Sequence, residues 1–522
     1  MKQVKRIVLP RIAPLLVLCS LTLACGGGMS NSQYQTVWVA STQNPLVAQF
    51  SVQSPCTGTA SVDFGTDLSY GRSTASYPVQ AGNPGIKILV AGMRASSSYH
   101  MRSQVQCAAS TLFSRDVIFQ TGALPSISFP ALTVTRPNPS LSTLENPGIE
   151  MITVPTAGTP AFFTDRDANP IWYYDVGQNF PYTFKLLSNG DVLLNLVSPT
   201  DSTLREVDLA GNTIREMDIY ALHQKLQTAG YDFVPGGFHH DFVQLANDHL
   251  LVLINLSKSF TDLPGYPGTT DVQGDAVVDL DPDWNPVWVW NAFDHLDVNR
   301  HLNGLPDWTH SNALLYSPDD GNIIISMRHQ SWVMKVDYNN GTGTGTVLWR
   351  LGYQGDFALT QAGVPTDDSS LWFSFQHFPS LISQSGPQTM LAIWDNGDNR
   401  VLDAATGELC IDPRTGNNYP ACYSRPTVFQ IDESAKVADL QWSQALPYFS
   451  VWGGSINQLA NGNIEFDLNS PAIGPTPNVA SEVQEITQTP SPQVIWQMDI
   501  TIPTYAYRAY RIPSLYSGVT WP

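Results

Sequence analysis

Histidines at three places in the sequence and one arginine are candidates for a catalytic or binding site, because of their chemistry and their spacing. The His239-His240 pair, His310 and His377 each stand directly before a short apolar run, and Arg328 ends the run that follows His310. Apolar runs bounded by turn residues are typical of buried strands. A single histidine beside a strand is usually structural, whereas three at equivalent positions with an arginine indicate a functional site.

A metal site and an anion site are the two chemistries that such a set suggests. Three histidines can bind zinc, but Arg328 would repel a divalent cation and no acidic residue clearly joins them, so we expect no metal and no cofactor. A guanidinium fork and protonated imidazoles bind a tetrahedral anion. A neutral histidine can act as nucleophile or base. Asn396, in the turn after the apolar run TMLAIW, is a candidate to hold the second ring nitrogen of His377.

The elements that would position these residues belong to a weak repeat. Six hairpin-like segments, several ending in Trp, are predicted at 161–175, 205–219, 277–291, 333–350, 428–443 and 483–499. A turn followed by an apolar run precedes most of them, at 184–196, 242–255, 314–327 and 456–468. Repeated four-stranded units in an all-β chain predict a six-bladed β-propeller over 124–522, with five or seven blades as alternatives.

Three other segments of this region carry predictions. The strand at 148–155 is expected to pair with the C-terminal strands and close the ring. A helix is predicted at 221–230, and the Gly- and Pro-containing stretch 261–275 is predicted to be a loop.

A smaller domain precedes the repeat. Residues 35–123 alternate apolar and polar over short runs, which predicts a β-sandwich with no chemistry of its own. The segment VAGMRASSSYHMRSQV (90–105) resembles the fibronectin type III signature.

The N-terminus has the pattern of an export signal. Residues 1–24 combine a basic head with a short apolar run, and Cys25 follows small residues, as at a bacterial lipoprotein processing site. We expect a signal peptide at 1–24, a lipid on Cys25 and a flexible tether at 25–34, with plain secretory cleavage as the alternative. The protein would then lie in the periplasm or at the outer membrane as a lipoprotein, with the lipid as its link to the membrane.

The net charge limits the classes of binding partner, and the cysteine content indicates disulfide bonds. The formal net charge of -19 argues against nucleic acid as a partner. Four cysteines remain beyond the leader, and an even number in an exported chain predicts disulfides. Sequence order indicates the pairs Cys56–Cys107 and Cys410–Cys422.

From about residue 239 to 516 the chain resembles the bacterial arylsulfate sulfotransferases of the six-bladed propeller type. The segments that carry the resemblance are GFHHDFVQLANDHLLVL (237–253), WTHSNALLY (308–316), the Met-Arg at 327–328, FQHFPS (375–380), IWDNGDNR (393–400) and YRAYRIPSLY (507–516).

The resemblance implies a ping-pong reaction without the nucleotide donor PAPS and without a metal. His377 would take a sulfuryl group from a phenolic sulfate ester as a sulfohistidine and pass it to a phenolic acceptor. His240, His310 and Arg328 would stabilise the transferring group. The His239-His240 pair leaves either histidine open, and His240 is favoured because it directly precedes an Asp. The oligomeric state is left open, with a homodimer among the alternatives.

Two other classes of protein fit the same pattern. One is an exported propeller without catalysis that serves as a binding or scaffold module. The other is a metal-dependent propeller hydrolase or lactonase.

Overall fold

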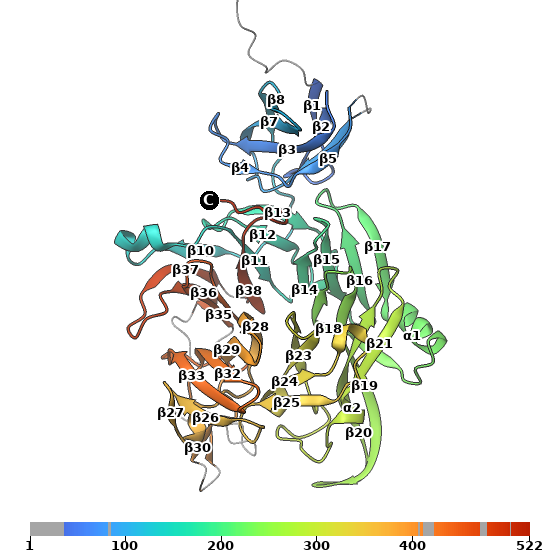
Figure 1. Cartoon of the computed structure of the whole chain (residues 1–522), viewed down its shortest axis with the longest axis vertical. Coiled ribbons are helices and arrows are strands. Elements are labelled where there is room, and N and C mark those ends of the chain that lie inside the picture. Colours follow the sequence, from blue (N-terminus) through green and yellow to red (C-terminus); the bar gives the residue numbers. More distant parts are fainter. Residues whose placement is uncertain are drawn as a thin grey trace, which may run out of the picture.

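The computed structural model describes residues 36–81, 85–403, 405, 408–410, 422–469, 478–501 and 503–522. The predicted signal peptide, the lipidation site Cys25 and the tether lie outside the described residues. Within the described ranges no helix is both long enough and apolar enough to cross a membrane. The protein is all-β, with many antiparallel sheets. Figure 1 shows a small N-terminal unit, in blue, next to a larger body that contains the rest of the chain.

The N-terminal unit consists of two antiparallel sheets that share one apolar core. The first sheet contains β1 (Thr36–Ser41), β2 (Ala48–Gln53) and β6 (Ile86–Val90). The second contains β3 (Gly58–Gly65), β4 (Arg72–Ser73), β5 (Tyr77–Val79), β7 (Ser98–Cys107), β8 (Thr111–Phe113) and β9 (Val117–Gln120). Alternating burial along β7 follows the period-2 pattern of its sequence.

The described residues of the larger body form six sheets of four to six strands and one two-stranded pair. The first sheet contains β11 (Ile149–Thr153), β12 (Ala161–Thr164), β13 (Pro170–Tyr174) and β38 (Arg508–Ile512). The second contains β14 (Phe180–Leu186), β15 (Val192–Val197), β16 (Ser202–Val207) and β17 (Thr213–Asp218). The third contains β18 (Pro235–Gln244), β19 (Leu250–Leu263), β20 (Tyr266–Leu280) and β21 (Pro286–Asn291).

The other three sheets continue this order along the chain. The fourth contains β22 (Ser311–Ser317), β23 (Asn322–Met327), β24 (Trp332–Val336) and β25 (Val347–Leu351). The fifth contains β26 (Ala358–Gln361), β27 (Val364–Pro365), β28 (His377–Ser385), β29 (Gln388–Asp395), β32 (Arg425–Asp432) and β33 (Val437–Ser443). The sixth contains β10 (Leu132–Thr135), β34 (Ser455–Gln458), β35 (Ile464–Asn469), β36 (Val479–Ile486) and β37 (Val494–Thr501). The separate pair is β30 (Val401–Asp403) with β31 (Glu408–Leu409).

Helices are few in the described ranges. The α-helices are α1 (Ile219–Thr228) and α2 (Ala292–His295), and the 3₁₀ turns are η1 (Pro139–Leu144), η2 (Arg328–Gln330), η3 (Asn339–Gly341) and η4 (Ser369–Leu371). The helix predicted at 221–230 is therefore confirmed as α1, which begins after the N-cap Asp218.

One strand from each sheet contacts the corresponding strand of the next sheet in chain order. β14 contacts β18, β18 contacts β22, β22 contacts β28, β28 contacts β34, and β34 contacts β38. β38 pairs with β11 in antiparallel register, which confirms the pairing predicted for 148–155, and β11 in turn contacts β14. The chain of contacts thus returns to its start, so residues at the entries of these strands converge.

The six predicted hairpins are confirmed, because each one forms the last antiparallel pair of its repeat: β12–β13, β16–β17, β20–β21, β24–β25, β32–β33 and β36–β37. The predicted loop at 261–275 is wrong. There β19 and β20 continue as a long two-stranded extension that turns at Gly265, whose φ is +81°. Thr and Asp fill this exposed ladder, and cross-strand pairing holds it without the apolar alternation that marks a buried strand.

The C-terminal tail joins the two units. The indole of Trp521 packs edge-on against Phe64 and donates a hydrogen bond to the carbonyl of Ser73, 2.9 Å away. The hydroxyl of Tyr516 donates to the carbonyl of Leu89 and accepts from the amide of Ala91.

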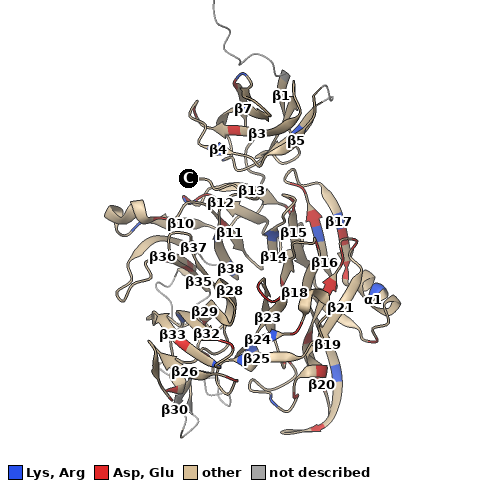
Figure 2. Cartoon of the chain, in the orientation of Figure 1, with Lys and Arg blue, Asp and Glu red and all other residues tan. Residues whose placement is uncertain are grey.

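Figure 2 shows charged residues scattered over the ribbon of both units.

Both predicted disulfides are confirmed. Cys56–Cys107 joins the residue two positions before β3 to the end of β7, and the Cys410–Cys422 disulfide packs against the buried ring of Phe449. We expect the double Cys410→Ser/Cys422→Ser variant to lose up to about 3 kcal/mol in free energy of unfolding, because the open loop gains chain entropy. Urea titration measures this loss.

The neighbouring Arg400 would transmit this change, since its carbonyl accepts from the amide of Cys410 and its side chain pairs with Asp395 at 2.9 Å. We therefore expect lower activity in this variant. The matched variant without Cys56–Cys107 should lose stability with its activity intact. Two free thiols at 410 and 422 in native protein, found by mass spectrometry, would contradict the pairing.

Candidate active site

The three histidines lie on or directly before strands of three successive sheets, as the sequence predicted, but His240 lies inside its strand and not at the entry. His240 lies in β18, His310 directly precedes β22 and His377 begins β28. His240 and His310 have left-handed backbones, with φ of +49° and +50°. Such conformations cost about 1–3 kcal/mol in a non-Gly residue and concentrate at functional sites.

Two tyrosines occupy the corresponding places in other sheets, and sequence reasoning missed both. Tyr182 lies near the start of β14, and Tyr507 directly precedes β38. The ring of Tyr507 lies 5.7 Å from that of His240 and 6.0 Å from that of His377. Its hydroxyl is buried and has no hydrogen-bond partner among the described residues. Position in the repeat was the signal that could have identified both tyrosines.

His377 is buried and both of its ring nitrogens are held. Its Nδ1 lies 2.7 Å from Oδ1 of Asn396, while the amide of Gly453 donates to its Nε2 at 3.1 Å. The Nδ2 of Asn396 donates to the carbonyls of Ser450 and Gly453, so its Oδ1 is the atom that faces the histidine. The Nδ1 of His377 therefore carries the proton, and Nε2 presents the lone pair.

Gly453 supplies that contact from a left-handed backbone conformation, which favours glycine. Its φ is +67°, and a Cβ there would lie 2.0 Å from Nδ2 of Asn469. The segment around it also accepts a hydrogen bond from Arg328 through the carbonyl of Val451, at 2.8 Å. One loop before β34 thus positions both the histidine and the arginine.

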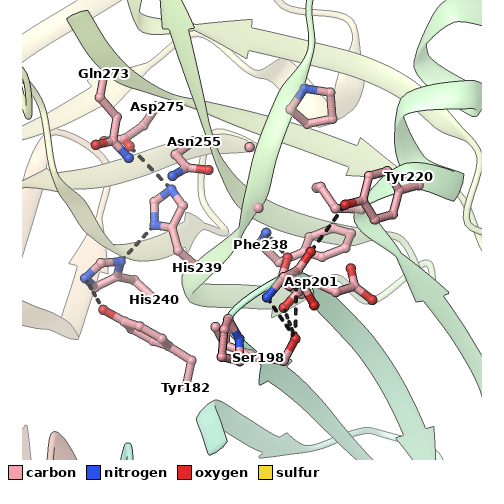
Figure 3. Close-up of a pocket in the computed structure, with 18 of the residues that line it drawn as sticks. Tyr182, Ser198, Asp201, Tyr220, Phe238, His239, His240, Asn255, Gln273 and Asp275 are labelled. Carbon is pink, nitrogen blue, oxygen red and sulfur yellow. Dashed lines mark hydrogen bonds and ion pairs between the residues drawn. The ribbon is translucent and has the colours of Figure 1, made fainter. Parts of the chain in front are cut away.

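His240 and His239 form a hydrogen-bonded chain (Figure 3). Tyr182 Oη lies 3.0 Å from Nε2 of His240, whose Nδ1 lies 2.8 Å from Nδ1 of His239. Nε2 of His239 lies 3.3 Å from Oδ1 of Asp275. The consistent proton arrangement has Tyr182 donating to His240, His240 to His239, and His239 paired with the carboxylate.

His240 rather than His239 adjoins the other site histidines. The ring of His240 lies 4.8 Å from that of His310, whereas His239 contacts His240 and Asp275. Burial would raise the pKa of Asp275, but hydrogen bonds from His239, Ser311 and Thr309 lower it to about 2. His239 therefore orients His240 and supports its ring.

His310 pairs with an aspartate that sequence reasoning missed. Nδ1 of His310 lies 2.6 Å from Oδ2 of Asp307, three residues earlier. Burial would raise the pKa of Asp307, but the hydrogen bond from His310 and the two nearby imidazoles keep it below its usual value. An Asp–His pair of this kind leaves Nε2 of the imidazole able to exchange a proton with a ligand.

Arg328 is fixed on three sides. Its Nη1 contacts Nε2 of His329 at 2.5 Å, its Nη2 lies 3.2 Å from Oδ2 of Asp398, and its guanidinium lies over the ring of Phe375 at 4.6 Å. Burial raises the pKa of Asp398 to about 8, although Arg328 acts in the opposite direction. The carboxyl is therefore largely neutral at pH 7, which leaves the positive charge of Arg328 uncompensated.

His240 and His377 are neutral at neutral pH, contrary to the expectation that protonated imidazoles add charge. Burial lowers the pKa of His240 and of His377 well below 6.5, with further lowering from neighbouring His310 and Arg328 respectively. Burial also lowers the pKa of His329 to about 4. Arg328 is thus the main fixed cation beside His377, and the histidines offer lone pairs and neutral donors.

A cavity of about 580 Å³ opens beside these histidines. It is lined by His239, His240, His310 and Tyr182 among others, with Asp201 and Tyr220 on the side away from His240 (Figure 3). Its size is within the range of small-molecule sites. His377 and Arg328 do not line it, so the cavity leads to the histidine cluster from the side of His240 and His310.

Among the residues that the structure describes, one cluster of side chains could hold a metal. Asp307, His310 and His329 offer ligand atoms that all lie within 4.8 Å of one another. However, Nδ1 of His329 bonds to the carbonyl of Asp307 at 2.8 Å and its Nε2 to Arg328. A metal would have to displace these bonds beside a guanidinium, so the donor set does not fit a resident cation.

The pKa directions predict an unusual pH profile. Because His377 stays neutral well below pH 6.5, we expect the rate of its modification by an aryl sulfate to be flat between about pH 6 and pH 7.5. Above about pH 8 Asp398 ionises beside Arg328, and the rate should fall several-fold. Stopped-flow measurement of phenol release gives this profile. The Asp398→Asn variant should lose the alkaline decline, and a loss of rate near pH 6.5 would contradict the low pKa of His377.

The fold and the site together define an all-β protein with a buried, oriented histidine beside a fixed arginine. The family model of arylsulfotransferases (ASST) matches residues 139–511. The chain therefore belongs to the arylsulfotransferase family, and this membership supports aryl sulfotransferase activity in general.

Comparisons with individual proteins add little. No curated protein matches the chain. A crystal structure of a protein from Lactobacillus plantarum matches at 10% identity and a TM-score of 0.35, covering 70% of this chain and 100% of its own. A member of the duf4221 family from Bacteroides vulgatus matches at 7% identity and a TM-score of 0.28, covering 74% of this chain and 99% of its own.

Proposed function

We propose that this protein is a PAPS-independent arylsulfate sulfotransferase that moves a sulfuryl group from a phenolic sulfate ester to a phenol by a ping-pong mechanism. The observation that carries the proposal is the environment of His377. A neutral imidazole with its proton held on Nδ1 by Asn396 presents Nε2 beside the arginine site. That arrangement is what a histidine nucleophile requires.

In the first half-reaction, Nε2 of His377 attacks sulfur and the S–O bond to the aryl group breaks. The phenolate that leaves carries the electron pair of that bond. Nε2 must give up its hydrogen bond from the Gly453 amide to form the N–S bond, and this amide can then donate to a sulfuryl oxygen. Arg328 stabilises the negative charge spread over the sulfuryl oxygens, and the buried hydroxyl of Tyr507 is a further donor.

In the second half-reaction, the oxygen of an acceptor phenol attacks sulfur and the N–S bond breaks. The phenolic proton must leave the oxygen, and the Asp307–His310 pair is positioned at the cavity to accept it. His240, held by Tyr182 and His239, forms the adjacent wall. No nucleotide, metal or cofactor takes part in these steps.

The proposal includes the architecture. We infer that the six sheets of residues 124–522 are the blades of a β-propeller, closed by the pairing of β38 with β11. The unit at 35–123 is proposed to be a fibronectin type III-like sandwich. The protein is proposed to be exported by the signal peptide 1–24 and to lie in the periplasm or at the outer membrane as a lipoprotein through Cys25.

The test uses purified protein with a chromogenic aryl sulfate, with and without an acceptor phenol. Release of the chromophore that depends on the acceptor, together with a sulfated acceptor in the mass spectrum, supports a transferase. Release into water alone supports a hydrolase, and no release with any donor favours a binding module.

The second candidate is a metal-dependent hydrolase, whose ligands would have to be Asp307, His310 and His329, although the existing hydrogen bonds of His329 oppose metal binding there. A chelator separates the two functions. The transferase retains its activity in the chelator, whereas a hydrolase built on that group loses it and regains it when zinc is added.

A further inference from the structure

The Asp, Lys and Arg content of the lining makes the cavity beside His240 acidic. Three aspartates line it, Asp201, Asp275 and Asp307, and none of the described residues that line it is Lys or Arg. The guanidinium of Arg328, which would hold the sulfuryl group, lies outside the cavity lining. The part of a ligand that occupies the cavity therefore meets carboxylates and no fixed cation.

Of the three carboxylates in this cavity, Asp201 has the weakest hydrogen bonding to protein groups. Asp275 accepts from the hydroxyl of Thr309 at 2.7 Å, and Asp307 accepts from His310. Oδ2 of Asp201 has only a long contact of 3.3 Å from the hydroxyl of Thr203. Its Oδ1 is buried and lacks a hydrogen-bond partner within the described ranges. The protein therefore compensates the charge of this partly buried carboxylate poorly, and a cation in the cavity would compensate it.

Aromatic rings lie on both sides of the cavity. Tyr182 contacts His240 at one side, and Phe238 and Tyr220 lie toward Asp201 at the other (Figure 3). The hydroxyl of Tyr220 donates to the carbonyl of Thr200 at 3.2 Å, which places its ring beside the segment that carries Asp201. Such walls suit a flat aryl group and also favour a cation near the ring faces.

We propose that the cavity selects phenols with a cationic substituent, such as a ring that carries an aminoalkyl chain, and that Asp201 is the specificity-determining residue. The identity of the ligand as a phenol rests on the proposed function. The phenolic oxygen faces the histidines, and the ammonium group lies toward Asp201 at the far side. A phenol with a carboxylate chain meets repulsion from the three aspartates instead.

The test compares three para-substituted phenols of similar size as acceptors: tyramine, which is cationic, 4-ethylphenol, which is neutral, and 3-(4-hydroxyphenyl)propionate, which is anionic. We expect kcat/KM for tyramine to exceed that for 4-ethylphenol by about tenfold, and the anionic phenol to be poorer than 4-ethylphenol by at least as much. In Asp201→Asn the ratio of tyramine to 4-ethylphenol should fall to about one. The comparison of ratios between variants cancels the different reactivities of the phenols.

Asp367→Asn is the matched control, since Asp367 is exposed and does not line the cavity. It should keep the wild-type ratio. Wild-type protein without a preference for tyramine, or Asp201→Asn with the preference intact, would overturn the proposal.

Binding separates this inference from the proposed function. Isothermal titration calorimetry without any sulfate donor measures the dissociation constants of tyramine and 4-ethylphenol directly. If no transfer occurs but tyramine binds about tenfold more tightly and Asp201→Asn removes that difference, the sulfotransferase proposal fails and the cation-selective cavity stands. If transfer occurs and the two ligands bind equally, the cavity inference fails alone.

Discussion

Replacing His377 by Asn should abolish both the covalent adduct and turnover. The amide of Asn can keep a contact with Asn396 or Gly453, but it has no lone pair able to attack sulfur. We expect turnover to fall by about four orders of magnitude or more, which is the scale on which enzymes lose activity with their nucleophile. Incubating wild-type protein with donor alone should add one sulfuryl group, and peptide mapping should place it on His377.

The controls for this experiment address folding and position. Asn is close to His in size, so the melting temperature of the variant should stay near that of wild type. His223→Asn on α1, away from the strand entries, should keep full activity. Variants of His240 and His310 should form the adduct more slowly and at the same residue. An active His377→Asn enzyme, or an adduct on another histidine, would show that the nucleophile is a different group.

The second large effect is expected at Arg328. Because His240 and His377 are neutral, this guanidinium is the main fixed positive charge beside the nucleophile for a sulfuryl group in transfer. Arg328→Ala should lower kcat by about 100-fold or more, with KM less affected, since the charge it stabilises develops in the transition state. Arg328→Lys should restore little, because a single ammonium nitrogen lacks the planar fork that places Nη1 on His329 and Nη2 on Asp398 and the Val451 carbonyl.

Arg350 provides the matched control. It lies on β25, in the same sheet as the strands β23 and β24 that flank Arg328, and its side chain is partly exposed beside Asp356. Arg350→Ala removes one arginine from the same sheet and should leave kcat unchanged. Steady-state kinetics with a chromogenic donor measure both variants. Full activity in Arg328→Ala would remove this residue from the site.

Local patterns in the sequence determined the repeating part of this protein. Turn residues between apolar runs mark hairpins because the period of two and the turn geometry are properties of neighbouring residues. The sequence therefore predicted the six hairpins, the pairing of 148–155 with the C-terminus and the places of His240, His310 and His377. It also predicted both disulfides, since few cysteines remained to pair. It did not predict the strands at 261–275, because an exposed ladder needs no apolar alternation.

Only the tertiary structure decided which atoms of the site can react. Asn396 and Gly453, which lie 19 and 76 positions away in the sequence, determine which nitrogen of His377 carries the proton and which presents the lone pair. The preference for His240 over His239 rests on contacts with His310 and Tyr182.

The sequence also could not predict the protonation states of the site residues. Desolvation shifts their pKa values, and it depends on how completely neighbouring sheets enclose a side chain, which no local sequence pattern indicates. Burial makes His240 and His377 neutral and, by raising the pKa of Asp398 to about 8, keeps that carboxyl largely protonated at pH 7. Residue types therefore determined what chemistry was available to this chain, and the packing of strands distant in sequence decided the protonation state in which each group is held.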